Sequence, residues 1–368
     1  MHRKRLLPII MFCLSILIIA CSSDSSESSG SNILYIQLPI DNDDFFTNSH
    51  WNDPHVLYTG GEFVMYASSD SYVSNWDGYV RIFRFVSDDG KNWCITNGGD
   101  PVLALGASGE WDEHCTETPA VVYFNGLYHM FYTGYDVAYD YEDIGADSTW
   151  GTADDDNASK HFKIGHATSP DGINWTKVGA IINPSSPYTD PNLDFNQYVV
   201  GEPGPVVFNN QIYLYFTATG AAAEVGTTWQ TIGLVKSNSD ATSWSTPQRV
   251  LTPRLDLYPR NSGDEYIGYS TPNAIVLDGE MHLYFDVATN DPWKQVKIHH
   301  AYSSDGESGW IQDDTPLLER EDYFWTADEI RSPAALEYDN DLYLYFAGHY
   351  NEATSPVLCI GLKVYDEY

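Results

Sequence analysis

Three acidic residues occupy corresponding points of a repeated sequence pattern. Asp53 and Glu202 each directly precede a proline, and Glu117 lies two residues before Pro119. Carboxyl groups that meet in one pocket can break a glycosidic bond, because one donates a proton to the leaving oxygen while another activates water or attacks the sugar. A third acid can keep the donor protonated near neutral pH. These residues are therefore the candidate catalytic group, provided that the fold brings them together.

The pattern around these acids occurs five times and is typical of a β-hairpin. In each copy a proline is followed, six residues later, by a turn pair that opens a second, aromatic-rich strand. The five prolines are Pro54, Pro119, Pro203, Pro272 and Pro333. The residue before the proline is acidic in the first and third copies, but it is Thr118, Thr271 or Ser332 in the others. Because all five copies need the same turn but only some have an acid there, the acidic residues are candidates for a functional role.

The segments between the hairpins also favour strands. A strand followed by an Asp-Gly turn and a tryptophan occurs at 79–93, 164–175 and 298–310, with a degenerate copy at 232–244. Asp-Gly pairs supply the positive φ that tight hairpins need. Each repeat then holds about four strands, the content of one propeller blade. The sequence predicts an all-β fold, a five-bladed β-propeller over residues 33–368.

The last repeat is too short for a complete blade. About 35 residues follow Pro333, enough for three strands of typical length. We expect residues 33–38 to supply the missing strand, so that an N-terminal strand in the last blade closes the ring and removes exposed sheet edges.

The N-terminus predicts export and a lipid anchor. Residues 1–20 hold three basic residues followed by a short apolar run, as in a lipoprotein signal peptide, and Cys21 stands where such a peptide is cleaved and acylated. A plain secretory signal is the alternative. Residues 21–32 form a Ser-rich tether. We therefore expect a bacterial cell-envelope protein, held by its lipid at the outer membrane and facing the periplasm or the cell exterior.

The charge balance restricts the partners. The formal net charge is −34, and cleavage before Cys21 would remove three basic and no acidic residues, giving −37. Nucleic acid needs a basic footprint, so it is excluded as a partner, and a polyanionic glycan is disfavoured. A neutral carbohydrate bound by a monomer, with no membrane contact beyond the lipid, fits best.

The remaining cysteines leave two alternatives. After Cys21 only Cys94, Cys115 and Cys359 remain in the predicted mature chain. A Cys94–Cys115 disulfide is plausible outside the cytoplasm, and free buried thiols are an equal alternative.

The repeated motifs resemble the five-bladed propeller enzymes of glycoside hydrolase families 43 and 32. Asn52-Asp53-Pro54 is similar to the first-blade motif of both families, whose Asp is the general base in inverting members and the nucleophile in retaining ones. Glu202-Pro203 falls where those families have a third-blade Asp-Pro that tunes the acid or steadies the transition state. The resemblance implies a glycosidase acting on an arabinose-, xylose-, fructose- or galactose-type end group.

One position departs from the family pattern. Those families place the proton donor, a Glu, two residues before the blade-four proline, where this chain has Ser270. The donor must then be Glu202, Glu117 or Glu265, and we favour Glu202, with Glu117 second. The missing Glu also leaves open a non-catalytic, surface-tethered glycan-binding propeller. A phosphorylase ranks last, because few cationic residues are present to hold phosphate.

Four further residues beside the prolines are candidate substrate-binding groups. They are Trp51, His55, His114 and Arg331. Arg331 could instead form an ion pair with Asp328 or Glu329.

No cofactor is required by this chemistry, and no metal ligand is assigned at the site. The acidic segment 136–160 has carboxylates and glycines suited to a structural Ca²⁺, although it fits no EF-hand spacing and could equally be a solvated loop or a wall of the pocket.

Overall fold

The fold is described from a computed structural model. The structure describes residues 33–36, 51–70, 78–143, 145–146, 156–185, 195–260, 266–290, 293–352 and 355–366. The expected leader, Cys21, the tether and Glu265 lie outside these residues. Among those described, no helix is long and apolar enough to cross a lipid bilayer.

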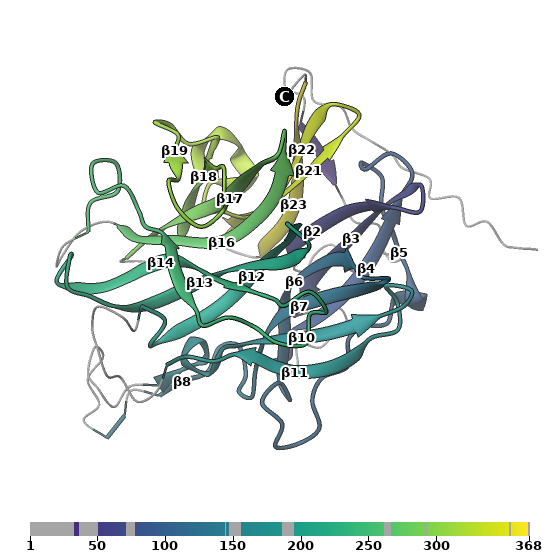
Figure 1. Ribbon diagram of the computed structural model, residues 1–368, viewed down its shortest axis with the longest axis horizontal. Coiled ribbons are helices and arrows are strands. Elements are labelled where there is room, and N and C mark those ends of the chain that lie inside the picture. The colour runs from purple at the N-terminus through teal and green to yellow at the C-terminus, as the bar shows by residue number, and fades with distance from the viewer. Residues whose placement is uncertain are drawn as a thin grey trace, which may run out of the picture.

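The regular elements of the described chain are almost all β-strands, as the sequence predicts, and they fall into five consecutive units (Figure 1). Unit 1 has the strand order β2 (Asn52–Thr59), β3 (Glu62–Ser69), β4 (Arg81–Ser87) and β5 (Cys94–Ile95). Unit 2 has the order β6 (Cys115–Phe124), β7 (Leu127–Tyr135), β10 (Lys163–Ser169) and β11 (Thr176–Ile182). Between β7 and β10, the short strands β8 (Glu142–Asp143) and β9 (Asp156–Asn157) pair with each other.

Units 3 and 4 are joined in one sheet. Unit 3 contains β12 (Val199–Phe208), β13 (Gln211–Ala222), β14 (Thr227–Lys236) and β15 (Gln248–Leu251). Unit 4 contains β16 (Tyr266–Leu277), β17 (Glu280–Thr289), β18 (Gln295–Ser303), β19 (Ile311–Gln312) and β20 (Leu318–Glu319). The two units meet through a single parallel pair, Gln230 with Gly268. A Cβ on Gly268 would lie 1.9 Å from the Gln230 carbonyl oxygen, so only glycine permits this contact.

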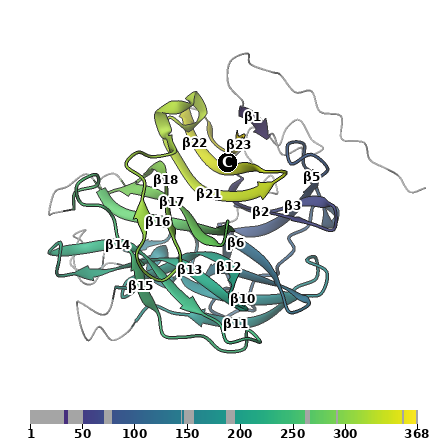
Figure 2. The same ribbon diagram turned by 45° about the horizontal axis from the view of Figure 1, so that its top comes forward.

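Unit 5 combines the two ends of the described chain. It contains β21 (Glu329–Tyr338), β22 (Asp341–Glu352) and β23 (Ser355–Tyr365), and β1 (Ile33–Ile36) pairs antiparallel with β23 (Figure 2). The described connections hold four short 3₁₀ segments: η2 (Asn97–Gly99), η3 (Ala158–His161), η4 (Arg320–Asp322) and η5 (Phe324–Thr326).

The hydrophobic core is divided among the five junctions between units. Five apolar clusters each combine buried side chains of two neighbouring units. Phe63 of β3, for example, packs in one cluster with Tyr345 of β22 and Leu362 of β23, which joins unit 1 to unit 5. The first strands β2, β6, β12, β16 and β21 contact one another in cyclic order, and they surround the middle of the molecule in Figure 1.

Hydrogen bonds from tyrosines add to this packing. The Tyr66 hydroxyl donates to the Gly172 carbonyl oxygen at 2.6 Å, joining units 1 and 2. Tyr345 donates to the Gly90 carbonyl oxygen at 2.8 Å, joining units 5 and 1. Gly90 and Gly172 belong to the Asp-Gly turns singled out in the sequence and have positive φ there. The repeated turn therefore has a second role, since it presents an acceptor to the neighbouring unit.

Candidate active site

A β-bulge interrupts the first strand of every unit at its proline. The strand pairing shifts register there in all five units. The residue before each proline has positive φ: Asp53 (51°), Thr118 (48°), Glu202 (53°), Thr271 (47°) and Ser332 (54°). Such a conformation is costly for residues with a side chain and tends to occur at functional sites. Since a bulge re-aims the side chain beside it, the repeat turns these five residues toward the centre.

The five pre-proline residues line one narrow cavity. Asp53, Glu202 and their counterparts lie around it together with the five prolines. Its volume is about 20 Å³, enough for about one water molecule. The structure therefore brings Asp53 and Glu202 together although they are far apart in sequence.

Asp53 is held at one oxygen. Its side chain is buried, and its Oδ1 accepts a hydrogen bond from the Ser332 hydroxyl at 2.8 Å. Within the described part of the chain, no hydrogen bond reaches its Oδ2. A carboxylate fixed at one oxygen and free at the other is suited to activate water or to attack a sugar.

Glu202 is held by a residue of its own unit and by one of the next unit. Its Oε2 accepts hydrogen bonds from the Thr217 hydroxyl at 2.5 Å and the Thr271 amide at 3.1 Å. Burial raises the pKa of Glu202, and the charge of Asp53 raises it further, whereas the bond from Thr217 lowers it. Two donors directed at one oxygen favour the ionised carboxylate there.

Glu117 has the environment of a proton donor. Burial and then the negative charge of Asp53 raise the pKa of Glu117 to about 8, against a lowering by Arg331. Its Oε2 accepts a single hydrogen bond from the Tyr135 hydroxyl, at 3.2 Å. The geometry thus favours Glu117 over Glu202 as the proton donor, the reverse of the sequence-based preference.

A fourth acid, Asp286, was not predicted. It lies on β17 opposite Ser270, the residue at the family's proton-donor position. The Ser270 hydroxyl donates to Asp286 Oδ1, and the Ser332 amide donates to Oδ2 at 3.1 Å. Asp286 is fully buried, which raises its pKa to about 7, with a further contribution from the charge of Glu202.

The sequence held a signal for Asp286. The second strands place Ser68, Thr133, Thr217, Asp286 and Ala347 at equivalent points, each paired with the residue two before its unit's proline. Only unit 4 has an acid there. A comparison of the five second strands at this position, looking for the one repeat with an acidic residue, would have found Asp286.

Arg331 lies beside the acidic residues, as its position two residues before the fifth proline suggested. Its Nη1 pairs with Glu329 Oε2 at 3.1 Å, while its Nε is buried without a hydrogen-bond partner among the described residues. The positive charge of Arg331 lowers the pKa values of both Glu117 and Glu202. Arg331 is therefore the cation that partly balances this acidic site.

The other three predicted binding residues have different environments. Trp51 is 5% exposed and packs edge-on against Phe83 and Phe85, so the expectation that it stacks on sugar is corrected: it is a core residue. The His55 ring nitrogen Nε2 is 2.9 Å from the Val121 carbonyl oxygen, and burial lowers the pKa of His55 to about 4. His114 stacks on Tyr79 with ring centroids 4.7 Å apart.

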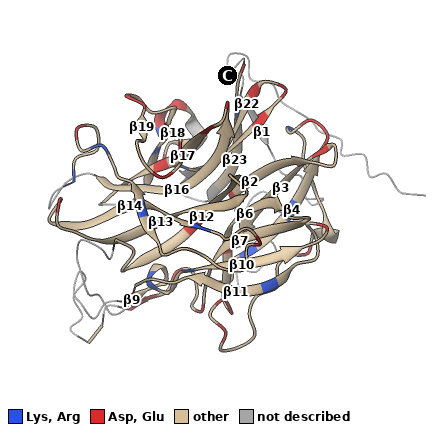
Figure 3. Ribbon diagram, viewed as in Figure 1, with Lys and Arg blue, Asp and Glu red and all other residues tan. Residues whose placement is uncertain are grey.

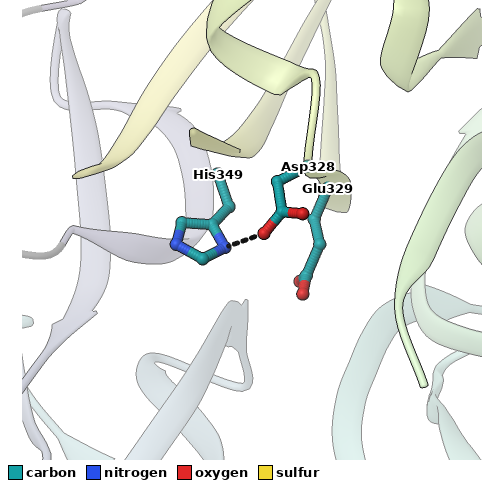
Figure 4. A group of neighbouring side chains, drawn as sticks. All are labelled: Asp328, Glu329 and His349. Carbon is teal, nitrogen blue, oxygen red and sulfur yellow. Dashed lines mark ion pairs between the residues drawn. The ribbon is translucent and has the colours of Figure 1, made fainter. Parts of the chain in front are cut away.

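A carboxylate–histidine cluster lies next to Arg331. Asp328, Glu329 and His349 place one ligand atom each within 4.8 Å of one another (Figure 4). His349 Nδ1 is 3.1 Å from Asp328 Oδ2, and the Lys294 ammonium also pairs with Asp328. Because Lys294 and Arg331 already neutralise these carboxylates, a divalent cation would have to displace them. The cluster is an ion-pair network.

Two further expectations concern the calcium loop and the disulfide. Asp136 and Asp156 contact the two ring nitrogens of His161 at 2.8 and 3.0 Å, while Asp147, Gly151, Asp154 and Asp155 lie outside the described residues. Cys115 and Cys359 are free thiols, so the alternative of a Cys94–Cys115 disulfide is wrong. The Cys115 sulfur is buried beside the Gly78 and Val137 carbonyl oxygens, which satisfies it without a bridge.

Solved structures resemble this fold, although the sequence has no match among family models or curated proteins. A thermostable family-43 glycoside hydrolase of known structure matches with a TM-score of 0.59 at 15% identity, covering 87% of this protein and 92% of the other. An exo-1,5-α-L-arabinanase from a bovine ruminal metagenomic library matches with a TM-score of 0.55 at 15% identity, covering 87% and 93%.

A third structure comes from the marine bacterium Zobellia galactanivorans. It is Zg3597, a family 117 glycoside hydrolase, and it matches with a TM-score of 0.59 at 12% identity, covering 91% of this protein and 90% of that one. The chain has the β-propeller fold of these glycoside hydrolases. The resemblance inferred from the repeated prolines is confirmed at the level of fold, and the low identity agrees with a divergent sequence.

Proposed function

We propose that this protein is a glycoside hydrolase that cleaves a neutral oligo- or polysaccharide by carboxylate acid–base chemistry at the cluster of Asp53, Glu117 and Glu202. The observation that carries the proposal is the acidic cluster itself. Asp53 and Glu202 line one cavity, and both of their charges raise the pKa of Glu117. A carboxyl group whose pKa is raised, next to further carboxyl groups, is an arrangement suited to glycoside cleavage.

The environment of each acid suggests its role. Glu117 retains its proton near neutral pH and donates it to the leaving oxygen. Asp53 uses its free Oδ2 to activate water or to attack the anomeric carbon, and Glu202 stabilises the positive charge that develops on the sugar. Arg331, with its unpaired Nε, binds substrate hydroxyl groups.

The charge of the site argues for a neutral substrate. The positive charge of Arg331 interacts with Asp53, Glu117, Glu202 and Asp286, and acidic residues are more numerous than basic ones along the described chain (Figure 3). A uronic acid or sulfated sugar would be repelled unless Arg331 compensated for all of its neighbours. Neutral pentoses and hexoses are therefore the class to test first.

The test is a screen of the whole protein on neutral plant and algal oligosaccharides, with products identified by mass. We expect new reducing ends from the wild type, and losses of about 100-fold or more in kcat for Asp53→Asn and Glu117→Gln. Glu337→Gln, which changes an exposed carboxylate on β21, is the matched control and should keep full turnover. Full turnover in both site variants would refute the assignment.

Ser270 favours one alternative, a non-catalytic glycan-binding propeller, because it replaces the family's proton donor. Calorimetry separates the two functions. A binder would hold an oligosaccharide from the same panel indefinitely with no new reducing ends, whereas the hydrolase would turn it over.

The architecture and location complete the proposal. We expect the five units to be the blades of one closed propeller, with β1 as the closing strand. The pairing of β1 with β23, the cyclic contacts of the first strands and the five junction clusters support this. We also expect an acyl chain on Cys21 that holds a monomer to the bacterial outer membrane. Labelling with radioactive palmitate that persisted in Cys21→Ala would refute that anchor.

A further inference from the structure

A repeated hydrogen bond joins four of the five units to the next one at the central cavity. In units 1 to 3, a hydroxyl on the second strand accepts the pre-proline amide of the following unit. The pairs are Thr118 N to Ser68 Oγ (2.9 Å), Glu202 N to Thr133 Oγ1 (2.8 Å) and Thr271 N to Thr217 Oγ1 (2.8 Å). These three bonds fix the bulges of units 1 to 4 relative to one another.

Unit 4 makes the same bond with a carboxylate. Asp286 occupies the hydroxyl position and accepts the Ser332 amide at Oδ2, while its Oδ1 accepts the Ser270 hydroxyl. Since each oxygen has its own donor and the side chain is fully buried, the carboxylate is fixed in orientation. The Ser332 backbone is held in turn at its strained, positive φ.

Unit 5 has no equivalent acceptor. Its residue at this position is Ala347, whose side chain cannot accept a hydrogen bond, so it does not hold the Asp53 amide. Asp53 is instead fixed through its carboxylate, by the Ser332 hydroxyl. The orientation of Asp53 therefore depends on Ser332, and that of Ser332 depends on Asp286.

We infer that Asp286 is a positioning residue for the proposed reaction. It holds the Ser332 amide so that the Ser332 hydroxyl fixes Asp53 Oδ1 and leaves Oδ2 turned to the substrate. The inference rests on the proposed function for Asp53, but the geometric link through Ser332 can be tested separately. Asp286 acts through its two acceptor oxygens and not by giving or taking a proton.

Three variants test this link on whichever oligosaccharide the wild type cleaves. Asp286→Ala removes both acceptors, Ser332→Ala removes the hydroxyl alone, and each should lower kcat about 10- to 100-fold with KM changed less than about twofold. Asp286→Asn can still accept the Ser332 amide through its oxygen and donate to Ser270, so it should stay within about fivefold of the wild type. The double variant Asp286→Ala/Ser332→Ala should be no worse than either single variant, since both break one link.

Tyr345→Phe is the control for the loss of a bond between units. It removes the hydrogen bond from unit 5 to the Gly90 carbonyl oxygen of unit 1, which reaches neither Asp53 nor Glu117, so it should lower stability while keeping kcat. Equal losses in Asp286→Asn and Asp286→Ala would overturn the inference, because Asp286 would then act through its proton. Multiplied losses in the double variant, or wild-type kcat in Ser332→Ala, would also overturn it.

Crystal structures of the variants give a readout that needs no activity. The distance from Ser332 Oγ to Asp53 Oδ1 should stay near 2.8 Å in Asp286→Asn and exceed hydrogen-bond distance in Asp286→Ala. An unchanged distance in Asp286→Ala would refute the positioning role. If Asp286→Ala does not fold, Asp286→Asn and Ser332→Ala still decide the question. A wild type that cleaves nothing would refute the proposed function alone.

Discussion

Replacing Glu117 with glutamine should stabilise the protein at alkaline pH while removing its activity. In the folded protein the pKa of Glu117 is raised to about 8, mainly by burial and then by the charge of Asp53, whereas an ordinary glutamate has a pKa of 4.5. The folded state therefore keeps a proton that the unfolded chain releases between these two values. Over that window each rise in pH favours unfolding, and Glu117→Gln removes this effect because glutamine does not titrate.

The size of the effect follows from the width of the window. One pKa unit corresponds to about 1.4 kcal/mol, so the full shift is worth roughly 5 kcal/mol of unfolding free energy at alkaline pH. The Glu117 side chain keeps some contact with solvent, which screens the interaction, and we therefore expect about half of this value. At pH values below 4.5 the wild type and the variant should differ little through this group, because Glu117 is then protonated in both states.

Urea unfolding followed by tryptophan fluorescence measures this difference. The free energy of unfolding of Glu117→Gln minus that of the wild type should rise from about pH 5 to about pH 8 and then level off. Glu337→Gln, an exposed glutamate on β21, should give a flat difference. A flat difference for Glu117→Gln as well would show that Glu117 is ionised at neutral pH, and the assignment of the proton donor would fail.

Three more predictions concern the site and the junctions between units. The wild-type kcat/KM should fall about tenfold per pH unit above about pH 8, where Glu117 loses its proton. Arg331→Gln should move this fall to higher pH, because the charge of Arg331 lowers the pKa of Glu117. The pH–rate profiles of both proteins check these expectations. Trp51→Ala should lower the free energy of unfolding by about 3–5 kcal/mol, as expected for a buried aromatic side chain, and a loss under about 1 kcal/mol would contradict its place in the core. Tyr345→Phe removes the bond from unit 5 to the Gly90 carbonyl oxygen, and chemical denaturation should show a loss of about 0.5–1.5 kcal/mol.

Much of the fold could be predicted because each repeat carries its own local signals. The turn pairs, the aromatic second strands and the Asp-Gly turns specify hairpins by turn chemistry and alternation alone. The pairing of β1 with β23 followed from counting strands in the last repeat. The junction of units 3 and 4 at Gly268 could not be predicted, since it depends on how closely two backbones approach.

The site was predicted in part. The acids next to prolines were found because they break the equivalence of the repeats. Trp51 was expected to contact substrate but packs in the core. A bulge shifts the alternation of inward-facing and outward-facing side chains along the strand, so the distance in sequence from the proline does not tell which face a residue takes. Our preference for Glu117 over Glu202 as the candidate proton donor depends on hydrogen bonds to Glu202 from Thr217 and Thr271. These donors lie in other strands, so the local sequence around Glu202 does not reveal them.

The bulge before each proline allows the pre-proline residue to differ between units without a change in the fold. Backbone shape alone turns the pre-proline side chain inward, and Asp, Thr, Glu, Thr and Ser all adopt it. A reactive group can therefore stand at any of the five positions without a change in any strand. Sequences that differ in these residues would share the fold without sharing a recognisable motif, which agrees with the match to solved structures at 12–15% identity.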